Sequence, residues 1–222
     1  VYNEERTIIE ILKKVNIQKK FFDLEIIISD DGSNDLTNYL LNNHKNLYDK
    51  VFFSKKNLGK GAAINAVKEL VTGDIVIIQD ADLEYDPSDY KYLVEPIINN
   101  KTKIVYGSRV LGKNRYELKN FLSLWRVFFN HLLTIISNII NNQKLTDAHT
   151  CYKVFKSEIF KQIDLKEKGF AFCPEVTSKI SNLKLNIFEV PINYKGRTKA
   201  QGKKIKVMDG IVALCAIIKY KL

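Results

Sequence analysis

Four acidic side chains lie within the nine residues QDADLEYDP, positions 79–87, directly after the apolar run at 75–78. Asp80 and Asp82 are two residues apart, so their side chains point the same way if this stretch is extended. Carboxylates that converge at the end of a buried strand suit a hard divalent cation, Mg²⁺ or Mn²⁺, which binds one or two carboxylates together with phosphate oxygens of a ligand. A solvated acidic turn is the alternative interpretation.

A second acidic stretch, SDDGSNDLT at 29–37, also follows an apolar run. Asp30 and Asp31 are placed to accept hydrogen bonds from a base N–H group or from ribose hydroxyls, as acidic residues at strand ends do in nucleotide-binding folds. Ser33 is expected to cap the following helix, with Asp35 in its first turn. The two roles are compatible, so this stretch predicts a nucleoside-binding edge.

Basic residues that complement these carboxylates occur at two later places. Arg109 follows the predicted strand 103–106, where a guanidinium can bind phosphate through two parallel hydrogen bonds. The stretch YKGRTKAQGKKIK, at 194–206, holds six Lys and Arg residues and two glycines, which favours a loop that closes over phosphates. Arg197 and Lys204 are the residues of this loop that we expect to contact the phosphates.

The elements that must position these residues alternate between strands and helices. Strands are predicted at 24–28, 51–53, 74–79 and 103–106, and helices begin near Glu4, Ser33, Gly59 and Ser88. The strands are apolar without alternation, which is typical of strands covered on both faces, so an α/β fold with a mainly parallel sheet flanked by helices is predicted. No strand precedes the helix at Glu4, so a first strand is expected upstream of Val1.

Length and charge narrow the classes of protein. The 222 residues suit one large domain rather than two. Their 35 Lys and Arg against 25 Asp and Glu give a net charge of +10, which favours a partner with phosphate groups: a nucleotide, a nucleic acid or an anionic membrane surface. Cys151, Cys173 and Cys215 lack the spacing of a zinc site or a disulfide framework, so a reducing cytosol is expected.

The acidic and basic stretches follow one another in an order that resembles family 2 glycosyltransferases. The stretches that carry this resemblance are VYNEE (1–5), DDGSNDLT (30–37), NLGKGAAINA (57–66), QDADLEYDP (79–87) and YGSRVL (106–111). Similarity to the dolichyl-phosphate mannose synthase branch and its bacterial polyprenyl-phosphate relatives is carried by TDAHTCYKVF (146–155), GFAFCPEVT (169–177), EVPINYKGRTKAQGKKI (189–205) and DGIVAL (209–214). The resemblance covers nearly the whole chain.

The resemblance implies a GT-A fold in one domain, 1–222, in which 1–112 bind the nucleotide sugar and 113–222 bind the acceptor. It also implies a nucleotide-diphosphate sugar donor, GDP-mannose or a UDP-sugar, a divalent metal, and inversion at the anomeric carbon. The expected nucleotide-binding residues are Tyr2, Glu4, Asp30, Asp31, Lys60 and Lys204. The expected metal ligands are Asp80, Asp82 and Glu84, the last at a position where many relatives have Gln. The expected catalytic residues are Asp80, Asp82, Arg109 and Arg197.

The acceptor decides whether the chemistry needs a general base. A polyprenyl or dolichyl phosphate is largely ionised at neutral pH and needs none, whereas a saccharide hydroxyl needs a group that takes its proton. Asp147 and Glu175 are the candidates for that group, although Glu175 also suits the N-terminal turn of a helix after Pro174. The lipid phosphate is preferred, which predicts a cytoplasmic protein, peripheral at the cytoplasmic face of a membrane.

Residues 118–141 carry a broad apolar stripe at helical spacing. Such a stripe is typical of a helix packed on the sheet, and also of a surface that enters a bilayer interface. The longest apolar run near the end, 211–218, has eight residues, fewer than the roughly 20 needed to cross a bilayer.

Two other classes of protein compete with this interpretation. GKGAAI, at 59–64, is half of the GxGxxG motif of NAD-binding enzymes, but its sixth position is Ile64. The net charge also suits a nucleic-acid-binding module, which predicts lysines interleaved with exposed aromatic residues on one face. The lysines here are scattered, so a nucleic-acid partner is not expected.

Overall fold

A computed structural model describes residues 1–111, 121–197 and 207–221, and gives the backbone alone for 121–126 and 207. The helices are α1 (Ile8–Ile17), α2 (Thr37–Asn43), α3 (Lys60–Val67), α4 (Tyr90–Ile98), α5 (Phe121–Asn141), α6 (Ser157–Gln162), α7 (Phe172–Asn182) and α8 (Val207–Lys219). The strands are β1 (Ile27–Asp30), β2 (Lys50–Phe53), β3 (Ile75–Ile77), β4 (Ile104–Ser108), β5 (Lys153–Lys156) and β6 (Phe188–Pro191). Short 3₁₀ helices lie at Gln18–Lys20, Lys45–Leu47, Lys68–Leu70 and Pro87–Asp89.

The strands differ in direction. β1 and β2 pair in parallel, and the other strands form a sheet in the order β3, β5, β4, β6. β4 and β6 are parallel, whereas β5 is antiparallel to both β3 and β4. The α/β fold is confirmed, but the antiparallel strand was not predicted. Because β5 runs against its neighbours, it begins at the edge of the sheet where β3 and β4 end, which brings the residues before β5 to the ligand-binding rim.

β1 and β3 belong to different sheets and do not pair with each other. Beside β1, the Val1 nitrogen donates to the Ser29 carbonyl at 2.8 Å, and the Asp31 N–H donates to the Val1 carbonyl at 2.9 Å. This is the hydrogen-bonding pattern of a residue in a strand parallel to β1. The strand expected upstream of Val1 stays a prediction.

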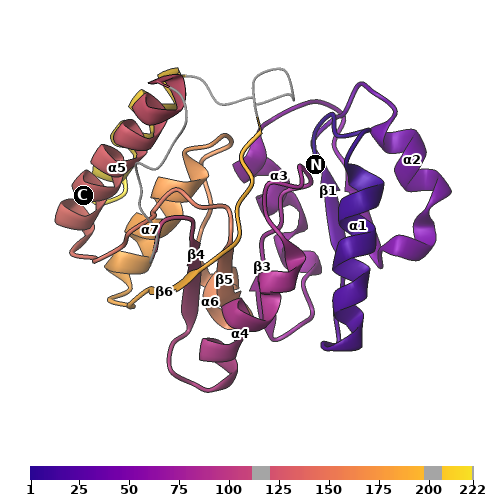
Figure 1. Cartoon of the computed structure of the whole chain (residues 1–222), viewed down its shortest axis with the longest axis horizontal. Coiled ribbons are helices and arrows are strands. Elements are labelled where there is room, and N and C mark those ends of the chain that lie inside the picture. Colours follow the sequence, from indigo (N-terminus) through magenta and orange to yellow (C-terminus); the bar gives the residue numbers. More distant parts are fainter. Residues whose placement is uncertain (112–120, 198–206, 222) are drawn as a thin grey trace.

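β4 is the most deeply covered part of the four-stranded sheet, because all of its residues are buried. α4 packs against β4, and α7 packs against both α5 and α8. Figure 1 shows α1 and α2 at one end of the molecule and α5, with the C-terminus beside it, at the other. The strands therefore lie between α1 and α2 at one end and α5 at the other.

Neither Ser33, which was expected to cap a helix, nor Ser88, where a helix was expected to begin, is a helix cap. The Ser33 hydroxyl donates to Asp30 Oδ1 at 2.5 Å and accepts the Asn3 N–H at 2.8 Å, so it joins the turn after β1 to the N-terminal segment. In the second case Asp86, not Ser88, is the cap, because its Oδ1 accepts the Ser88 N–H at 3.0 Å at the start of a 3₁₀ helix. The first helix also begins later than predicted, at Ile8.

The helix predicted over 118–141 is confirmed for 121–141 by α5, and much of the apolar stripe is open to solvent in the part whose side chains are described. Both α5 and α8, which contact each other, carry large exposed apolar side chains at helical spacing. These side chains, called here the apolar face, are Phe128, Phe129, Leu132, Ile135 and Ile139 of α5 and Met208, Ile211, Val212 and Ile218 of α8. Exposed apolar groups of this extent mark an interaction surface. Within the described residues, no helix combines the length and apolarity required of a membrane span.

Candidate active site

Asp80 and Asp82, called here the DxD carboxylates, lie in a turn after β3 and not in an extended strand. Leu83, between Asp82 and Glu84, has a φ of 60°, a left-handed conformation that is unfavourable for a branched side chain. This turn lets Asp82 Oδ1 accept the Glu84 N–H at 3.1 Å. Asp80, Asp82 and Glu84 all line one cleft, and a strained turn rather than strand alternation brings them there.

Gln79 fixes the backbone before this turn. Its Oε1 accepts hydrogen bonds from the hydroxyls of Tyr90 at 3.0 Å and Tyr152 at 2.7 Å, and its Nε2 donates to the Asp80 carbonyl at 2.9 Å. Tyr90 begins α4 and Tyr152 directly precedes β5, so these three hydrogen bonds tie the backbone at Asp80 to both elements. The sequence carries no local signal of this role, because Tyr152 is 73 residues away.

Lys60 neutralises the first DxD carboxylate. Its Nζ lies 2.7 Å from Asp80 Oδ1 and 2.9 Å from Oδ2. Burial would lower the pKa of Lys60, but the charge of Asp80 raises it well above its usual value, so the ammonium stays protonated. Burial likewise acts to raise the pKa of Asp80, and the charge of Lys60 outweighs it, leaving that pKa lowered.

The start of α3, which carries Lys60, is held by close backbone contacts. Gly59 has a φ of 101°, and a Cβ there would lie 2.6 Å from the Lys168 carbonyl oxygen. The N–H groups of Gly61 and Ala62 donate to the carbonyls of Gly169 at 3.3 Å and Lys168 at 3.0 Å. Segment 168–169 therefore satisfies the first N–H groups of this helix, which helix ends otherwise leave without partners.

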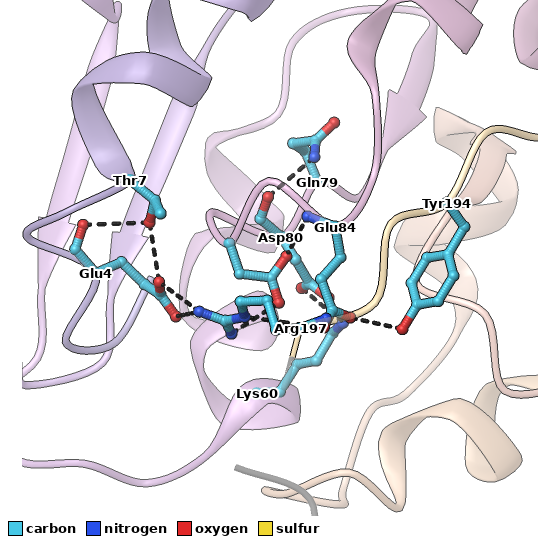
Figure 2. Close-up of polar contacts among 9 residues, drawn as sticks. Glu4, Thr7, Lys60, Gln79, Asp80, Glu84, Tyr194 and Arg197 are labelled. Atoms are coloured by element: carbon cyan, nitrogen blue, oxygen red, sulfur yellow. Dashed lines mark hydrogen bonds and ion pairs between the residues drawn. The ribbon is translucent and has the colours of Figure 1, made fainter. Parts of the chain in front are cut away.

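Arg197 neutralises the second DxD carboxylate and links it to the N-terminal segment. Its Nη2 lies 2.9 Å from Asp82 Oδ2, and its Nη1 lies 3.0 Å from Glu4 Oε2. Its backbone N–H donates to Glu84 Oε1 at 2.6 Å, and the Tyr194 hydroxyl donates to Glu84 Oε2 at 2.8 Å. Figure 2 shows Arg197 between Glu4 on one side and Glu84 and Tyr194 on the other.

The segment that carries Arg197 is anchored beside the DxD turn. Tyr194 forms an antiparallel bridge with Tyr85, their ring centroids are 5.2 Å apart, and the Lys195 N–H donates to the Glu84 carbonyl at 2.9 Å. Glu84 thus holds this segment through its side chain and its backbone. Its assignment as a metal ligand stays a prediction. Lys204 lies outside the described residues.

Asp82 is the carboxylate whose surroundings best fit a divalent cation. Burial and the charges of Asp80 and Glu84 raise the pKa of Asp82 to about 6, against the opposing effect of Arg197. A bound cation would relieve this repulsion. In the parts of the chain that the structure describes, no three His, Cys, Asp or Glu side chains cluster closely enough to hold a metal by themselves. The donor set therefore fits a metal that takes its other ligands from phosphate oxygens.

The two aspartates after β1 have different surroundings. Asp31 lines the cleft, and its carboxylate accepts the N–H groups of Leu58 at 2.9 Å and Gly59 at 2.6 Å, so it also shapes the turn before α3. Asp30 is fully buried, its carboxylate accepts from the N–H and hydroxyl of Ser33, and it is not among the residues that line the cleft. In this structure Asp30 therefore closes a turn, and its contact with the nucleotide stays a prediction.

Arg109 forms a buried ion pair with Asp147. Its Nε and Nη2 lie 2.7 and 2.8 Å from the two oxygens of Asp147, and its guanidinium carbon lies 5.2 Å from the centroid of the Tyr194 ring. Burial would raise the pKa of Asp147, but the charge of Arg109 lowers it to about 2. Glu189 holds the same turn by accepting the N–H groups of Thr146 at 2.7 Å and Asp147 at 2.9 Å. Asp147 is therefore a very weak base.

Glu175 has a structural environment. It is fully buried, and its two oxygens accept the N–H groups of Lys166 at 2.7 Å and Glu167 at 2.9 Å. Lys179 Nζ lies 2.6 Å from Glu175 Oε1. The carboxylate thus holds the segment that contacts the start of α3, and it does not line the cleft. Asp147 lines the cleft, but both of its carboxylate oxygens are paired with Arg109, whereas Glu175 lies outside the cleft.

A cleft of about 3140 Å³ joins these groups. Among the predicted site residues, it is lined by Tyr2, Glu4, Asp31, Lys60, Asp80, Asp82, Glu84, Arg109 and Arg197. The same cleft reaches the two apolar helices, through Phe129 and Leu132 of α5 and Ile211 and Leu214 of α8. The cleft is therefore lined by carboxylates that could hold a metal, by cationic side chains that could bind phosphates, and by apolar side chains of α5 and α8.

The fold and this site define a glycosyltransferase of the GT-A fold. The sequence profile described as glycosyl transferase family 2 matches residues 1–164. The chain belongs to glycosyl transferase family 2.

Named relatives and solved structures are similar to the chain over most of its length. Dolichyl-phosphate beta-glucosyltransferase ALG5A from Trichomonas vaginalis is 29% identical over 98% of this chain and 70% of the relative. UDP-N-acetylglucosamine–dolichyl-phosphate N-acetylglucosaminyltransferase from Methanococcus voltae is 31% identical over 93% of this chain and 88% of the relative. A structure of glucosyl-3-phosphoglycerate synthase from Mycobacterium tuberculosis with uridine diphosphate superimposes with a TM-score of 0.72 at 15% identity, covering 100% of this chain and 77% of the other. The last likeness concerns the fold alone.

Proposed function

We propose that this glycosyltransferase moves a hexose from GDP-mannose or a UDP-sugar to a polyprenyl or dolichyl phosphate, with inversion at the anomeric carbon. The observation that carries the proposal is the continuity of the cleft from the DxD carboxylates to Phe129 and Ile211 on the apolar helices. An acceptor with an anionic head and a long hydrocarbon tail matches both ends of this cleft. The names of the Trichomonas and Methanococcus relatives, which specify dolichyl phosphate, support the same acceptor class.

The environments of the two candidate bases favour a phosphate acceptor over a saccharide hydroxyl. Asp147 has a pKa of about 2 and is paired with Arg109, and Glu175 accepts backbone N–H groups with both oxygens. A hydroxyl acceptor needs a base with a pKa near neutrality, whereas a phosphate acceptor is already anionic. Transfer to phosphate therefore requires mainly that donor and acceptor be held in line.

A divalent cation, Mg²⁺ or Mn²⁺, is part of the proposal. Asp82, with Asp80 and Glu84, would hold it, and its bound charge would stabilise the departing nucleoside diphosphate. A solved structure of the glucosyl-3-phosphoglycerate synthase contains Mn²⁺ and UDP-glucose, which is consistent with a metal in this fold.

The basic side chains have matching roles in the proposal. Lys60 and Arg197 exchange their carboxylate partners for the phosphates of the donor, and Arg109 binds phosphate from the other side of the cleft. Tyr2, Glu4 and Asp31 lie at the nucleoside end. Residues 1–112 would thus bind the donor and 113–222 the acceptor, with Arg197 as the contribution of the second half to the donor site.

A position at a membrane surface follows from the acceptor. The apolar face of α5 and α8 would lie in the headgroup region of the bilayer, so that the lipid phosphate enters the cleft without leaving the membrane. We propose the cytoplasmic face, where nucleotide sugars are available, as the location.

The direct test is a transfer assay with labelled GDP-mannose, UDP-glucose and UDP-N-acetylglucosamine, each with polyprenyl phosphate in vesicles and Mn²⁺ or Mg²⁺. One donor should yield a glycolipid. Failure of all three with folded protein, or faster transfer to a saccharide hydroxyl than to the lipid, would overturn the proposal.

A further inference from the structure

The segment 147–151 crosses the rim of the sheet between the DxD turn and Arg109. It precedes β5, whose antiparallel direction places its start where β3 and β4 end. One end of the segment is held by the ion pair between Asp147 and Arg109. The other end is held at Cys151, whose N–H donates to the Tyr85 hydroxyl at 3.0 Å. The residue in the middle, His149, is thereby fixed between the two.

The imidazole of His149 has one nitrogen, Nε2, without a hydrogen-bond partner among the described residues. His149 lines the cleft, and its Nε2 is buried with no hydrogen-bond partner among the described residues. Burial and the charge of Lys153 lower the pKa of His149 to about 4, with Arg109 acting the same way and Asp147 opposing them. The ring is therefore neutral near pH 7, with one nitrogen as a donor and the other as an acceptor. A neutral imidazole suits a hydroxyl better than it suits a phosphate.

The order of groups along the rim indicates which part of a ligand lies beside His149. Asp31 follows β1 at the nucleoside end, the DxD carboxylates follow β3, and His149 precedes β5 on the far side of β3. A nucleotide sugar whose diphosphate lies at Asp82 directs its base toward one side and its hexose toward the other. We propose that His149 is a specificity-determining residue that forms a hydrogen bond with a hydroxyl of the donor hexose. This inference rests on the proposed function and adds a determinant of sugar choice.

Three variants separate sugar recognition from a structural effect. His149→Ala removes the imidazole, and His149→Gln keeps a hydrogen-bonding end. Thr150→Val is the matched control, because the Thr150 hydroxyl is also buried with no partner among the described residues, yet Thr150 does not line the cleft. For each variant kcat/KM is measured with donors that share one base and differ in one hydroxyl, such as UDP-glucose and UDP-galactose, or GDP-mannose and GDP-glucose. The Kd of the free UDP or GDP is measured in parallel.

His149→Ala should lower kcat/KM for the preferred sugar by about 10- to 100-fold, and should narrow the ratio between the two sugars by at least about fivefold. The Kd of the free nucleotide should change less than about twofold. His149→Gln should recover part of the loss, and Thr150→Val should retain the wild-type ratio. If His149→Ala does not fold, His149→Gln carries the test through a changed ratio of sugars.

An unchanged sugar ratio in the His149 variants, or an equal loss of affinity for free nucleotide and nucleotide sugar, would overturn the inference while leaving the proposed function intact. A wild-type protein that neither binds nor turns over any of these donors would instead overturn the proposed function, and this inference with it.

Discussion

Arg197 Nη2 lies 2.9 Å from Asp82 Oδ2, and this ion pair joins segments that are 115 residues apart in the sequence. Lys60 is paired with Asp80 in the same way, at 2.7 Å. The carboxylates that we propose for the metal and the cations that we propose for the phosphates thus neutralise each other. When a metal ion and a diphosphate bind together, the two aspartates would pair with the metal, and Lys60 and Arg197 would pair with the phosphates.

Arg197→Ala should therefore change the affinities for metal and nucleotide in opposite directions. The loss of the guanidinium leaves the negative charge of Asp82 and Glu4 less compensated, so Mn²⁺ alone should bind about 3- to 10-fold more tightly. UDP or GDP in the presence of Mn²⁺ should bind about tenfold more weakly, because a charged partner of the phosphates is lost. Calorimetric titration measures both. Lys14→Ala, at an exposed pair with Glu10, is the control; parallel changes in both affinities would refute the exchange of partners.

Asp147 should act as the partner of Arg109 and not as a base. Because its pKa is about 2, the pH–rate profile between pH 5 and 9 should contain no step from this group, and Asp147→Asn should lower kcat about 10- to 100-fold without altering the profile's shape. If wild-type kcat fell at low pH and this acidic limb disappeared in Asp147→Asn, Asp147 would instead act as a base.

The ion pair between Asp147 and Arg109 should stabilise the folded protein only above a defined pH. The folded pKa of Asp147 is depressed from the ordinary 3.8 to about 2, so its stabilisation is fully present above about pH 4 and is lost as the pH falls through 2. The loss should be on the order of 2 kcal/mol in the free energy of unfolding. Denaturant titrations at pH 2 to 5 on wild-type and Asp147→Asn protein measure it; an equal pH dependence in both would contradict the assignment.

Gly61→Ala should destabilise the protein far more than Gly73→Ala. A Cβ at Gly61 would lie 2.0 Å from the Glu167 carbonyl oxygen, whereas the nearest atom to one at Gly73 is 3.9 Å away. The first substitution must displace the segment against the start of α3, at a cost of about 2–4 kcal/mol in the free energy of unfolding, whereas the second should change it by less than about 1 kcal/mol. Equal denaturation midpoints for the two variants would show that this contact is absent in solution.

Glu175→Gln should lower stability without removing catalysis. An amide cannot accept both backbone N–H groups of Lys166 and Glu167, so the free energy of unfolding should fall by about 1–3 kcal/mol. The kcat of the folded enzyme should stay within about twofold. Glu158→Gln, at an exposed pair with Lys103, should change stability by less than about 0.5 kcal/mol. A large loss of kcat with wild-type stability would restore Glu175 as a base.

The sequence identified the parts of the site that lie in contiguous stretches. Each of these residues follows a strand or begins a helix whose apolar pattern can be read locally, so their position at one edge of the sheets was predictable. They are the DxD residues, Asp31, Lys60 and Arg109. The family was predictable for the same reason, because its motifs are short and ordered along the chain.

The remaining features depend on contacts between distant segments. The direction of β5 is set by its pairing with β3 and β4, and its four residues, KVFK, carry no signal of direction. The hydrogen bond from Tyr152 to Gln79 joins residues 73 apart in the sequence, and the one from the Asp147 N–H to Glu189 joins residues 42 apart. Local rules favour Ser33 as a helix cap, but in the fold its hydroxyl donates to Asp30 and accepts the N–H of Asn3.

The proposed role of Asp82 is tested most directly by the affinity of UDP and GDP for the wild-type protein and for Asp82→Asn, each with and without Mn²⁺. We predict that Mn²⁺ tightens binding of one nucleotide to the wild type by at least about tenfold, and that this gain disappears in Asp82→Asn while the variant keeps its wild-type melting temperature. An undiminished gain from Mn²⁺ in Asp82→Asn would contradict the account.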